Sequence, residues 1–242
     1  MMNRERLMRG LDALGIAYDQ TAIERFEAFH AILDEYNQKM DLTAVLDEDE
    51  RVDRHDLDSA APLAQGLLAQ NARVIDVGTG AGFPGMPLAI ARPDLKVTLL
   101  DSQRKRCDFL SAVCDELKLP NVTVLHARAE DGARGALREQ MDVAVARAVA
   151  PLNVLAEYLL PYVRVGGRML CWKGPAVREE MAAGERACKM LGGQAEGLYR
   201  LPIEGREHYV HSAIKISATA RRYPRKSGTP SKDPLGILPQ KP

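Results

Sequence analysis

Three glycines alternate in a segment that follows a short apolar run. The run Val74–Val77 contains one acidic residue, Asp76, and the glycines are Gly78, Gly80 and Gly82. A buried strand followed by a tight turn and a helix is the structure that this order predicts. Glycine accepts positive φ angles and lets a ligand approach the main chain, and the next helix presents its positive end. The segment therefore indicates a ligand-binding turn.

The spacing of the glycines separates two classes of ligand. Dinucleotide-binding turns favour Gly-x-Gly-x-x-Gly, with the pyrophosphate at the helix end. This chain has Gly-x-Gly-x-Gly, preceded by Asp76. A carboxylate there repels a pyrophosphate and suits a ligand that carries a cation. S-adenosylmethionine (SAM) has an ammonium and a sulfonium and no phosphate, so it fits this pattern; a tight turn without a ligand is the alternative.

Three further strand ends carry candidate ligand contacts, because ligands of open α/β sheets bind beyond the carboxyl ends of the strands. Asp101 ends the second predicted strand, 101 − 76 = 25 residues after Asp76. A carboxylate at this place can bind both ribose hydroxyls, although Asp101 is also a candidate helix N-cap. Ala129 and Glu130 follow the third strand, where their backbone is expected to face an adenine; Glu130 is also placed to cap a short helix.

The fourth predicted strand ends in Arg147. Burying an unpaired guanidinium is unfavourable. Arg147 therefore either pairs within the protein or faces the ligand, and the second role is the prediction.

Composition limits the class of protein. The chain has 242 residues, 46% of them hydrophobic, which suits one domain with a substantial core. Lys and Arg total 33, as do Asp and Glu, so the net charge of zero gives no indication about nucleic acid. The four cysteines form no Cys-x-x-Cys pair, which favours a reducing, cytoplasmic setting. No apolar run approaches the ~20 residues that span a bilayer, and the N-terminus lacks a signal-peptide core.

The apolar pattern divides the chain into three parts. Residues 1–70 show helical periodicity and are expected to form a helical extension. Residues 71–218 alternate apolar runs with amphipathic segments, which predicts an α/β fold around a parallel sheet. Within it His208–Ser217 alternates as an exposed antiparallel edge strand does. The predicted strands are 73–77, 96–100, 122–126, 142–146 and 168–172, with two more between 195 and 217.

The helical extension contains a dense run of charge at residues 47–59. We expect this run to be the solvated face of a helix, with no metal site. A capping box of Thr21 and Glu24 predicts the start of a helix that ends near Met40. His30, within that helix, is expected to lie on the surface or to be hydrogen-bonded.

Residues 219–242 form a basic, proline-rich tail. Six Lys and Arg residues stand against Asp233 as the one acid, a net charge of 6 − 1 = +5. Five prolines argue against a regular helix. The tail is expected to be extended and to be mobile in the free protein.

Longer motifs extend over nearly the whole chain. They are Tyr36-Asn37, Asp41-Leu42-Thr43, Arg54-His55, Asp58-Ser59, Asp76 to Gly85, Asp101-Ser102, Lys105-Arg106, Phe109-Leu110, Arg128-Ala129-Glu130, Ala146 to Leu152, Lys173-Gly174, Tyr223-Pro224-Arg225 and Gly228-Thr229-Pro230. With these motifs the chain resembles the ribosomal RNA small subunit methyltransferase G family, once called glucose-inhibited division protein B. The glycine turn is common among methyltransferases, whereas the Asp-Leu-Thr block, the block after the fourth predicted strand and the tail are more specific.

This resemblance implies a class I SAM-dependent methyltransferase fold, which is Rossmann-like and has a seven-stranded, mostly parallel sheet with an antiparallel last strand. It implies methylation of N7 of one guanine in small-subunit (16S) ribosomal RNA, with the 30S subunit or its precursor as partner; a monomer is expected. By similarity Gly78, Phe83, Ala129, Glu130 and Arg147 contact SAM. With the residues found above, the expected cofactor site is Asp76, Gly78, Gly80, Gly82, Phe83, Asp101, Ala129, Glu130 and Arg147.

The chemistry of guanine N7 agrees with the residues present. N7 has an in-plane lone pair and no proton, so its methylation needs no general base, and no catalytic side chain is predicted. The Asn/Asp-Pro-Pro-aromatic loop of many amino-group methyltransferases is absent after Arg147, and no cysteine lies at a strand end as a nucleophile for C5 methylation. Holding two reactants in line can lower a barrier by about 7–11 kcal/mol.

Lysines and arginines are the expected contacts to RNA phosphates. An unpaired guanine is the expected target, because the groove of paired RNA is deep and narrow. Three other functions stay open: a methyltransferase of protein or small molecules, an NAD-linked oxidoreductase and a non-catalytic RNA-binding assembly factor. A solvated tail without RNA contacts is also open. The candidate RNA contacts are Arg54, Lys173, Arg221, Arg222, Arg225 and Lys226.

Overall fold

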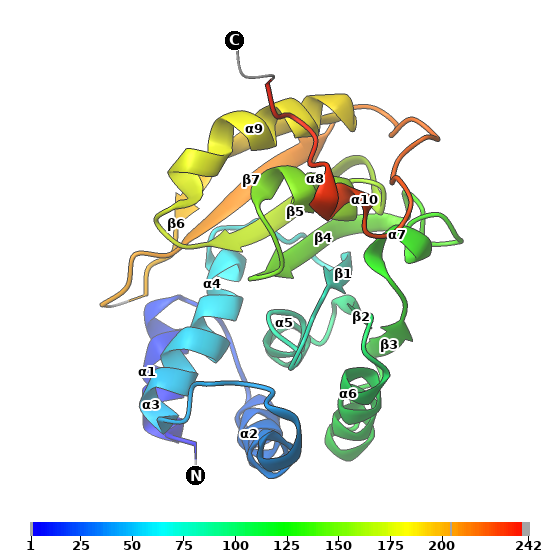
Figure 1. Cartoon of the computed structure of the whole chain (residues 1–242). Helices are drawn as coiled ribbons and strands as arrows, with labels where there is room; N and C mark the ends of the chain where they lie inside the picture. The colour runs from blue at the N-terminus through cyan, green and yellow to red at the C-terminus, as the bar shows by residue number, and fades with distance from the viewer. Residues whose placement is uncertain (1, 204, 239–242) are drawn as a thin grey trace.

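The computed structural model describes residues 2–203 and 205–238. A seven-stranded sheet runs through the molecule in the order β3-β2-β1-β4-β5-β7-β6 (Figure 1). β1 to β5 are parallel to their neighbours in this series, and β7 is antiparallel to both β5 and β6. The predicted α/β fold and its antiparallel strand are confirmed. The strands are β1 (Arg73–Val77), β2 (Lys96–Asp101), β3 (Val122–His126), β4 (Met141–Arg147), β5 (Val163–Lys173), β6 (Gly193–Arg200) and β7 (Tyr209–Lys215).

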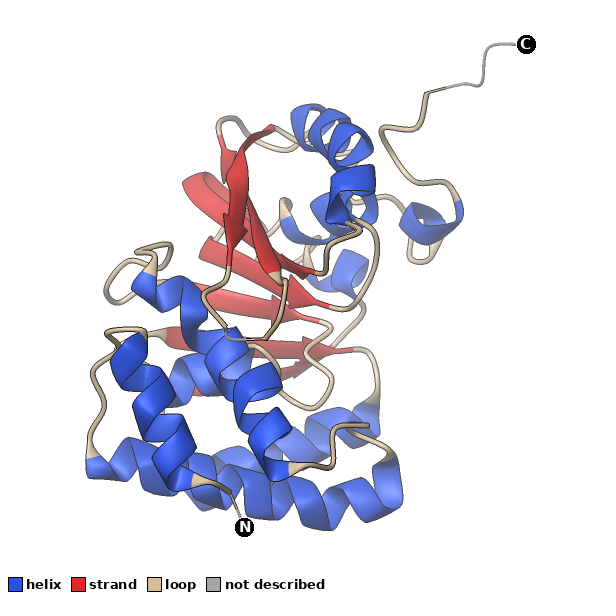
Figure 2. Cartoon of the chain, turned by 90° about the vertical axis from the view of Figure 1, so that its left-hand side faces the viewer, coloured by secondary structure: helices blue, strands red, loops and turns tan. Residues whose placement is uncertain are grey.

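Helices cover both faces of the sheet (Figures 1 and 2). One layer contains α1 (Arg4–Ala13), α2 (Gln20–Met40), α3 (Glu48–Arg51), the π-helix η1 (Val52–Leu57), α4 (Asp58–Ala64), α5 (Gly85–Ala91) and α6 (Arg104–Leu117). The other contains α7 (Ala129–Gly132), α8 (Leu152–Leu159), α9 (Val177–Met190) and α10 (Thr229–Lys232).

A hydrophobic cluster lies between the sheet and each of these two helical layers. Val74 and Val145 point into the first cluster, whereas Ile75 and Ala144 point into the second, because successive side chains of a strand face opposite sides. The buried strands therefore show few polar residues. Both faces are covered, as expected for a parallel sheet.

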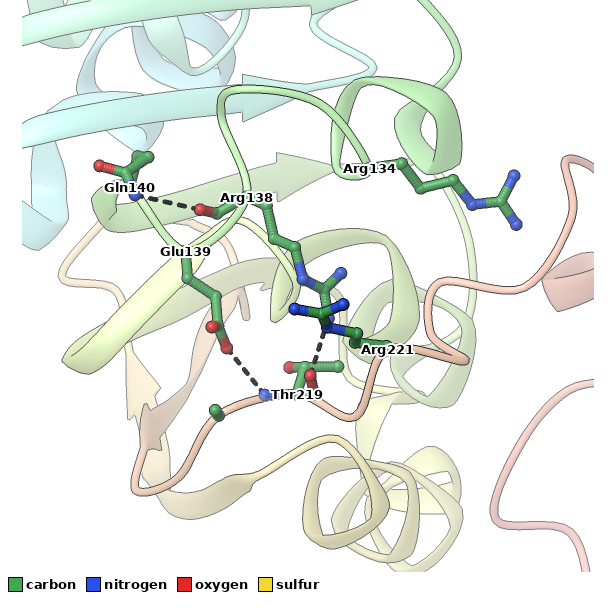
Figure 3. A pocket seen from close by; sticks show the side chains of 7 residues that line it. Arg134, Arg138, Glu139, Gln140, Thr219 and Arg221 are labelled. Carbon is green, nitrogen blue, oxygen red and sulfur yellow. Dashed lines mark hydrogen bonds between the residues drawn. The ribbon is translucent and has the colours of Figure 1, made fainter.

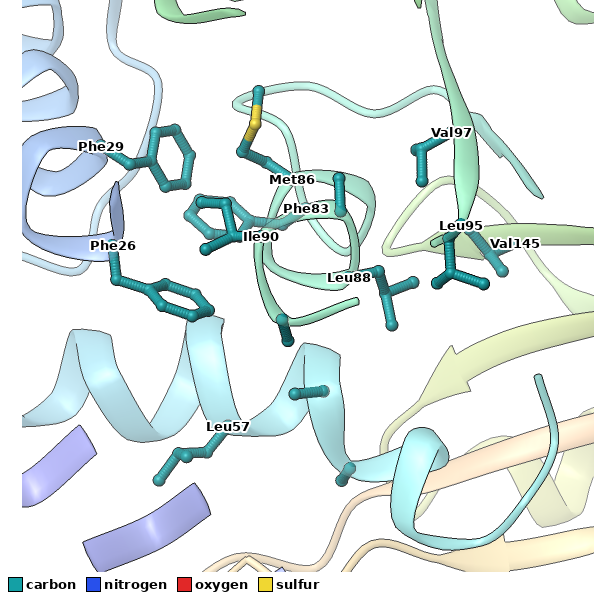
Figure 4. Packing of buried hydrophobic residues seen from close by; sticks show 14 of the residues in the cluster. Phe26, Phe29, Leu57, Phe83, Met86, Leu88, Ile90, Leu95, Val97 and Val145 are labelled. Carbon is teal, nitrogen blue, oxygen red and sulfur yellow. The ribbon is translucent and has the colours of Figure 1, made fainter. Parts of the chain in front are cut away.

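The N-terminal helices share the first cluster with α5. Phe26 and Phe29 of α2 point towards Phe83 and Ile90 (Figure 4), and the ring centroids of Phe29 and Phe83 lie 5.4 Å apart. The helical extension thus packs directly against the residue that ends the glycine turn. The proposed boundary at residue 70 remains a prediction.

Three expectations about local structure are wrong. α2 is capped by Asp19, whose side chain accepts a hydrogen bond from Ala22 N, and not by Thr21. The strand predicted as an exposed edge is β7, which is interior because β6 pairs along its other side. In the charged run, Asp56 and Asp58 are 1% and 0% exposed, since α3, η1 and α4 follow one another and turn these side chains inward. Asp56 there contacts the buried His30, with 2.7 Å between Oδ2 and Nε2.

The basic tail is packed on the second helical layer and was wrongly expected to be mobile. Its residues up to 238 are described, and they include the short helix α10, which has Pro230 in its first turn. Arg225 pairs with Glu157 of α8, with 2.7 Å between Nη2 and Oε2. A proline is tolerated in the first turn of a helix, because the N–H that it lacks has no partner there.

The described residues contain no helix that is long and apolar enough to cross a membrane. Among them, no group of three or more His, Cys, Asp and Glu side chains is arranged to hold a metal ion. The four cysteines are free, and Cys107, Cys171 and Cys188 are buried.

Candidate functional site

The glycine turn connects β1 to α5 at the carboxyl edge of the sheet. Gly78, Gly80 and Gly82 have φ angles of 73°, 61° and 99°, a region that side chains disfavour. A Cβ atom on Gly78 would lie 2.9 Å from Cγ2 of Val149, whereas a Cβ atom on Gly80 would meet no described atom within 4 Å. The turn therefore presents bare main chain to open space at Gly80.

The buried side chain of Asp76 stabilises this turn through hydrogen bonds. Its Oδ2 atom accepts hydrogen bonds from Thr79 Oγ1 at 2.7 Å and from Gly85 N at 2.8 Å, while Oδ1 has no partner among the described residues. Burial raises the pKa of Asp76 to about 6, although the hydrogen bonds from Thr79 and Gly85 oppose this shift. The carboxylate joins the end of β1 to the start of α5, and its charge disfavours a phosphate at the turn.

Asp101 lies beside the turn at the end of β2. Its Oδ2 atom accepts from Gly80 N at 3.0 Å and its Oδ1 atom from Gln103 N at 2.8 Å. The N-cap of α6 is Gln103, so Asp101 is not the helix cap. Each carboxylate oxygen can accept more than one hydrogen bond, and Asp101 therefore retains capacity for a ligand hydroxyl.

Arg147, at the end of β4, joins the turn to the N-terminal helices. Its guanidinium lies 5.0 Å from the centre of the Phe83 ring. Nη1 donates to the backbone oxygen of Arg54 at 2.9 Å and lies 3.3 Å from Asp58 Oδ2. Arg147 therefore pairs within the protein, with Asp58, and lies against the residue that ends the turn; that it faces the ligand remains a prediction.

His55 completes this cluster. Its ring stacks on Phe83 at 4.4 Å between centroids. Burial and the nearby charge of Arg147 lower the pKa of His55 to about 3, so the imidazole is neutral near pH 7. Nδ1 lies 3.3 Å from Arg147 Nη2 and must accept, which leaves the proton on Nε2 to donate to Thr43 Oγ1 at 2.8 Å.

A cavity of about 430 Å³ opens next to this cluster. Arg54 and Lys173, two of the predicted RNA contacts, line it together with Asp58 and Arg147. Lys173 Nζ donates to Glu180 at 2.6 Å. Sequence reasoning missed His55 and Asp58 because the charged segment that carries them was expected to be solvated, and it also missed His208, a further lining residue. The motifs Arg54-His55 and Asp58-Ser59 were the available signal: residues four apart on a helix share a face.

Known proteins are similar to this chain over most of its length. The family model described as rRNA small subunit methyltransferase G matches residues 22–208. The ribosomal RNA small subunit methyltransferase G of Alkaliphilus oremlandii is 46% identical over 235 residues, 96% of this chain and 98% of that protein. Its counterpart in Alkaliphilus metalliredigens is 44% identical over 238 residues, 97% and 100% of the two chains.

The chain belongs to the rRNA small subunit methyltransferase G family. It is accordingly a SAM-dependent methyltransferase, as its motifs implied. Solved structures share the fold: a SAM-dependent methyltransferase from Aquifex aeolicus aligns with a TM-score of 0.53 at 21% identity, covering 71% of this chain and 95% of that chain. A precorrin-6y C5,15-methyltransferase from Geobacter metallireducens aligns with a TM-score of 0.51 at 15% identity, covering 74% and 95%.

The residues at the carboxyl edge fit the cofactor of this methyltransferase family. The open main chain at Gly80, the acceptor capacity of Asp101 and the unpartnered Oδ1 of Asp76 suit a ligand that has a ribose and positive charge. Ala129 and Glu130 lie at the neighbouring strand end, in α7. The carboxylate of Glu130, however, faces the tail, where Oε1 accepts from Gly228 N at 2.7 Å. A role of Glu130 towards SAM therefore falls to its backbone.

The predicted RNA contacts of this methyltransferase lie in three places. Arg54 and Lys173 line the cavity at the carboxyl edge. Arg221 lines a different cavity of about 730 Å³, together with Arg138 and Glu139 (Figure 3). These two residues lie just before β4, so this cavity lies towards the amino ends of the parallel strands. The tail accounts for the others: Arg222 and Lys226 are exposed, whereas Arg225 is paired with Glu157.

Proposed function

We propose that this methyltransferase transfers the methyl group of SAM to N7 of one guanine in small-subunit ribosomal RNA, and that it does so by positioning alone. The proposal rests on one observation: the glycine turn and the cavity lie at the same edge of the sheet, where the parallel strands end. There Asp101 accepts from Gly80 N of the glycine turn, Phe83 at the end of that turn lies against Arg147, and Arg147 also lines the cavity with Arg54 and Lys173.

The donor site is proposed to consist of the nine residues expected from the sequence. Gly78, Gly80 and Gly82 offer main chain, and Asp101 accepts hydrogen bonds from the ribose. Ala129 and Glu130 face the adenine with their backbone. Asp76 shapes the turn from below, and Phe83 with Arg147 closes the end nearest the cavity. SAM supplies an electrophilic methyl group when bound.

No general base is assigned, and two candidate bases beside Arg147, His55 and Asp58, are engaged by other residues. Both ring nitrogens of His55 have partners, Arg147 and Thr43. Asp58 contacts Arg147 with one carboxylate oxygen and His208 with the other. The N7 lone pair needs no proton removed, so the task of the protein is to hold the guanine in line and to exclude water.

RNA is proposed to reach the cavity as an unpaired strand, with Arg54 and Lys173 at the phosphates nearest the target. Arg221, Arg222 and Lys226 are proposed to contact RNA farther away. Arg225 is proposed to anchor the tail, since its guanidinium is engaged by Glu157 and Asp233. A cytoplasmic monomer that acts on the 30S subunit or its precursor completes the proposal.

The test is methyl transfer from labelled SAM to small-subunit RNA isolated from cells that lack the enzyme. N7-methylguanine is then located by chain cleavage, since N7 methylation makes the glycosidic bond labile after reduction. Label at one guanine that appears only with the native enzyme supports the proposal. Absence of label, or label on an amino group or a carbon, overturns it.

A further inference from the structure

The tail makes direct contact with the carboxylate of Glu130. Gly228 N donates to Oε1 at 2.7 Å, and the hydroxyl of Ser227 lies 3.3 Å from Oε2. Glu130 is only 3% exposed. A buried carboxylate needs hydrogen-bond donors, and the tail supplies them from about a hundred residues farther along the chain, since Glu130 and Gly228 are 98 positions apart.

The tail residues that touch Glu130 are anchored on both sides. Before them, Arg225 pairs with Glu157, a fully buried residue of α8. After them, the hydroxyl of Ser231 lies 2.6 Å from that of Tyr158, and the Leu235 oxygen accepts from Asn153 Nδ2 at 2.8 Å. Residues 225–235, called the strap below, are therefore fixed to α8 at points that flank the contact with Glu130.

The segment that the strap touches has little support of its own. α7 consists of four residues, and so short a helix is unstable without tertiary contacts. From the other side, Tyr162 Oη donates to the Ala129 oxygen at 2.7 Å. Ala129 and Glu130 are thus held between a buried tyrosine and the strap.

We propose that the strap is a positioning element of the donor site: by holding Glu130 it sets the place of the Ala129-Glu130 backbone that faces the cofactor. The inference rests on the proposed function of these two residues. The strap acts through Glu130 and touches neither SAM nor RNA in this role. Loss of the contact weakens SAM binding and raises the KM for SAM, while kcat at saturating SAM changes little.

Two tail variants of the enzyme test the proposal, a substitution in the full-length chain and a truncation. Gly228→Val removes the contact because Gly228 has a φ of 81°, which a β-branched residue does not adopt. A chain that ends after Lys226 lacks Gly228 and keeps Arg225 with Glu157. In both, calorimetric titration with SAM should show affinity about tenfold weaker, the effect of losing one hydrogen bond to a charged group.

Ser231→Ala is the matched control. It removes one tail contact with α8 but keeps the anchors at Arg225 and Leu235 and leaves the contact with Glu130 untouched, so its SAM affinity should equal that of the native enzyme. Glu130→Gln keeps an acceptor for Gly228 N and should recover most of the affinity that Glu130→Ala loses. Unchanged SAM affinity in the truncated chain and in Glu130→Ala overturns the proposal that the strap positions the donor site. If the native enzyme binds SAM but does not methylate RNA, the proposed function is overturned, whereas the proposal for the strap still stands.

Discussion

The glycine turn and the cavity beside it lie at one edge of the sheet but are built in different ways. The turn is made by neighbours in sequence: Asp76 bonds to Thr79 and Gly85 within nine positions. The cavity depends on Arg147 and Asp58, which are 89 positions apart. Local sequence is enough to specify the first, whereas the second requires the N-terminal helices to be in place.

The largest expected effect follows from breaking the pair that holds the cavity. Arg147→Ala leaves the fully buried Asp58 carboxylate without its cation, and losing one partner of a buried pair costs about 3–5 kcal/mol. Urea unfolding measures the loss. The control is Arg164→Ala, which removes an exposed pair with Asp142 and should cost about 0–1 kcal/mol. Equal losses in the two variants would show that the cavity does not depend on the pair.

A second test concerns the charge beneath the turn. The pKa of Asp76 in the folded protein, about 6, exceeds its ordinary value of 3.8, so the folded state binds this proton more tightly than the unfolded state. Charged Asp76 therefore destabilises the protein above about pH 6, and this penalty is relieved as the pH falls from 6 towards 4. Relative to Asp76→Asn, the native protein should gain roughly 2 kcal/mol of unfolding free energy between about pH 7 and pH 4. Parallel pH profiles for the two proteins would contradict this assignment.

The smallest of the three effects separates backbone strain from ligand binding at the turn. Gly80 and Gly66 have φ angles of 61° and 67°, and a Cβ atom on either would meet no described atom within 4 Å. Gly80→Ala and Gly66→Ala should therefore lower the melting temperature to a similar extent. Only Gly80→Ala should weaken SAM binding, by about tenfold, as titration calorimetry would show. Equal SAM affinity in both variants would remove Gly80 from the donor site.

Much of the fold was predictable, because the period of apolar residues reports which residues are buried. The bounds of β1 and β3 agree with those expected from their apolar runs. The same signal does not reveal which strands pair. β7 alternates as an edge strand does, yet β6 folds back along it, and nothing within residues 208–217 encodes that neighbour.

The same distinction applies to the residues of the candidate site: some were predicted from the sequence and others were not. The glycines, Asp101 and Arg147 were found because each stands at a strand end, and parallel strands bring those ends to one edge. The burial of Asp56 and Asp58 was missed because charge on a helix is usually solvated. These two carboxylates are buried only because His30 and Arg147 meet them from other elements.

The sequence by itself determined the strands, the turn and the family, since each rests on residues close together in the chain or on motifs that keep their order. Only the tertiary structure decided the cavity and the place of the tail. Six basic residues and five prolines are equally compatible with a solvated chain end. What binds this tail to α8 is Glu157, a fully buried carboxylate that requires a cation. Such a requirement arises from burial, and burial is a property of the folded chain.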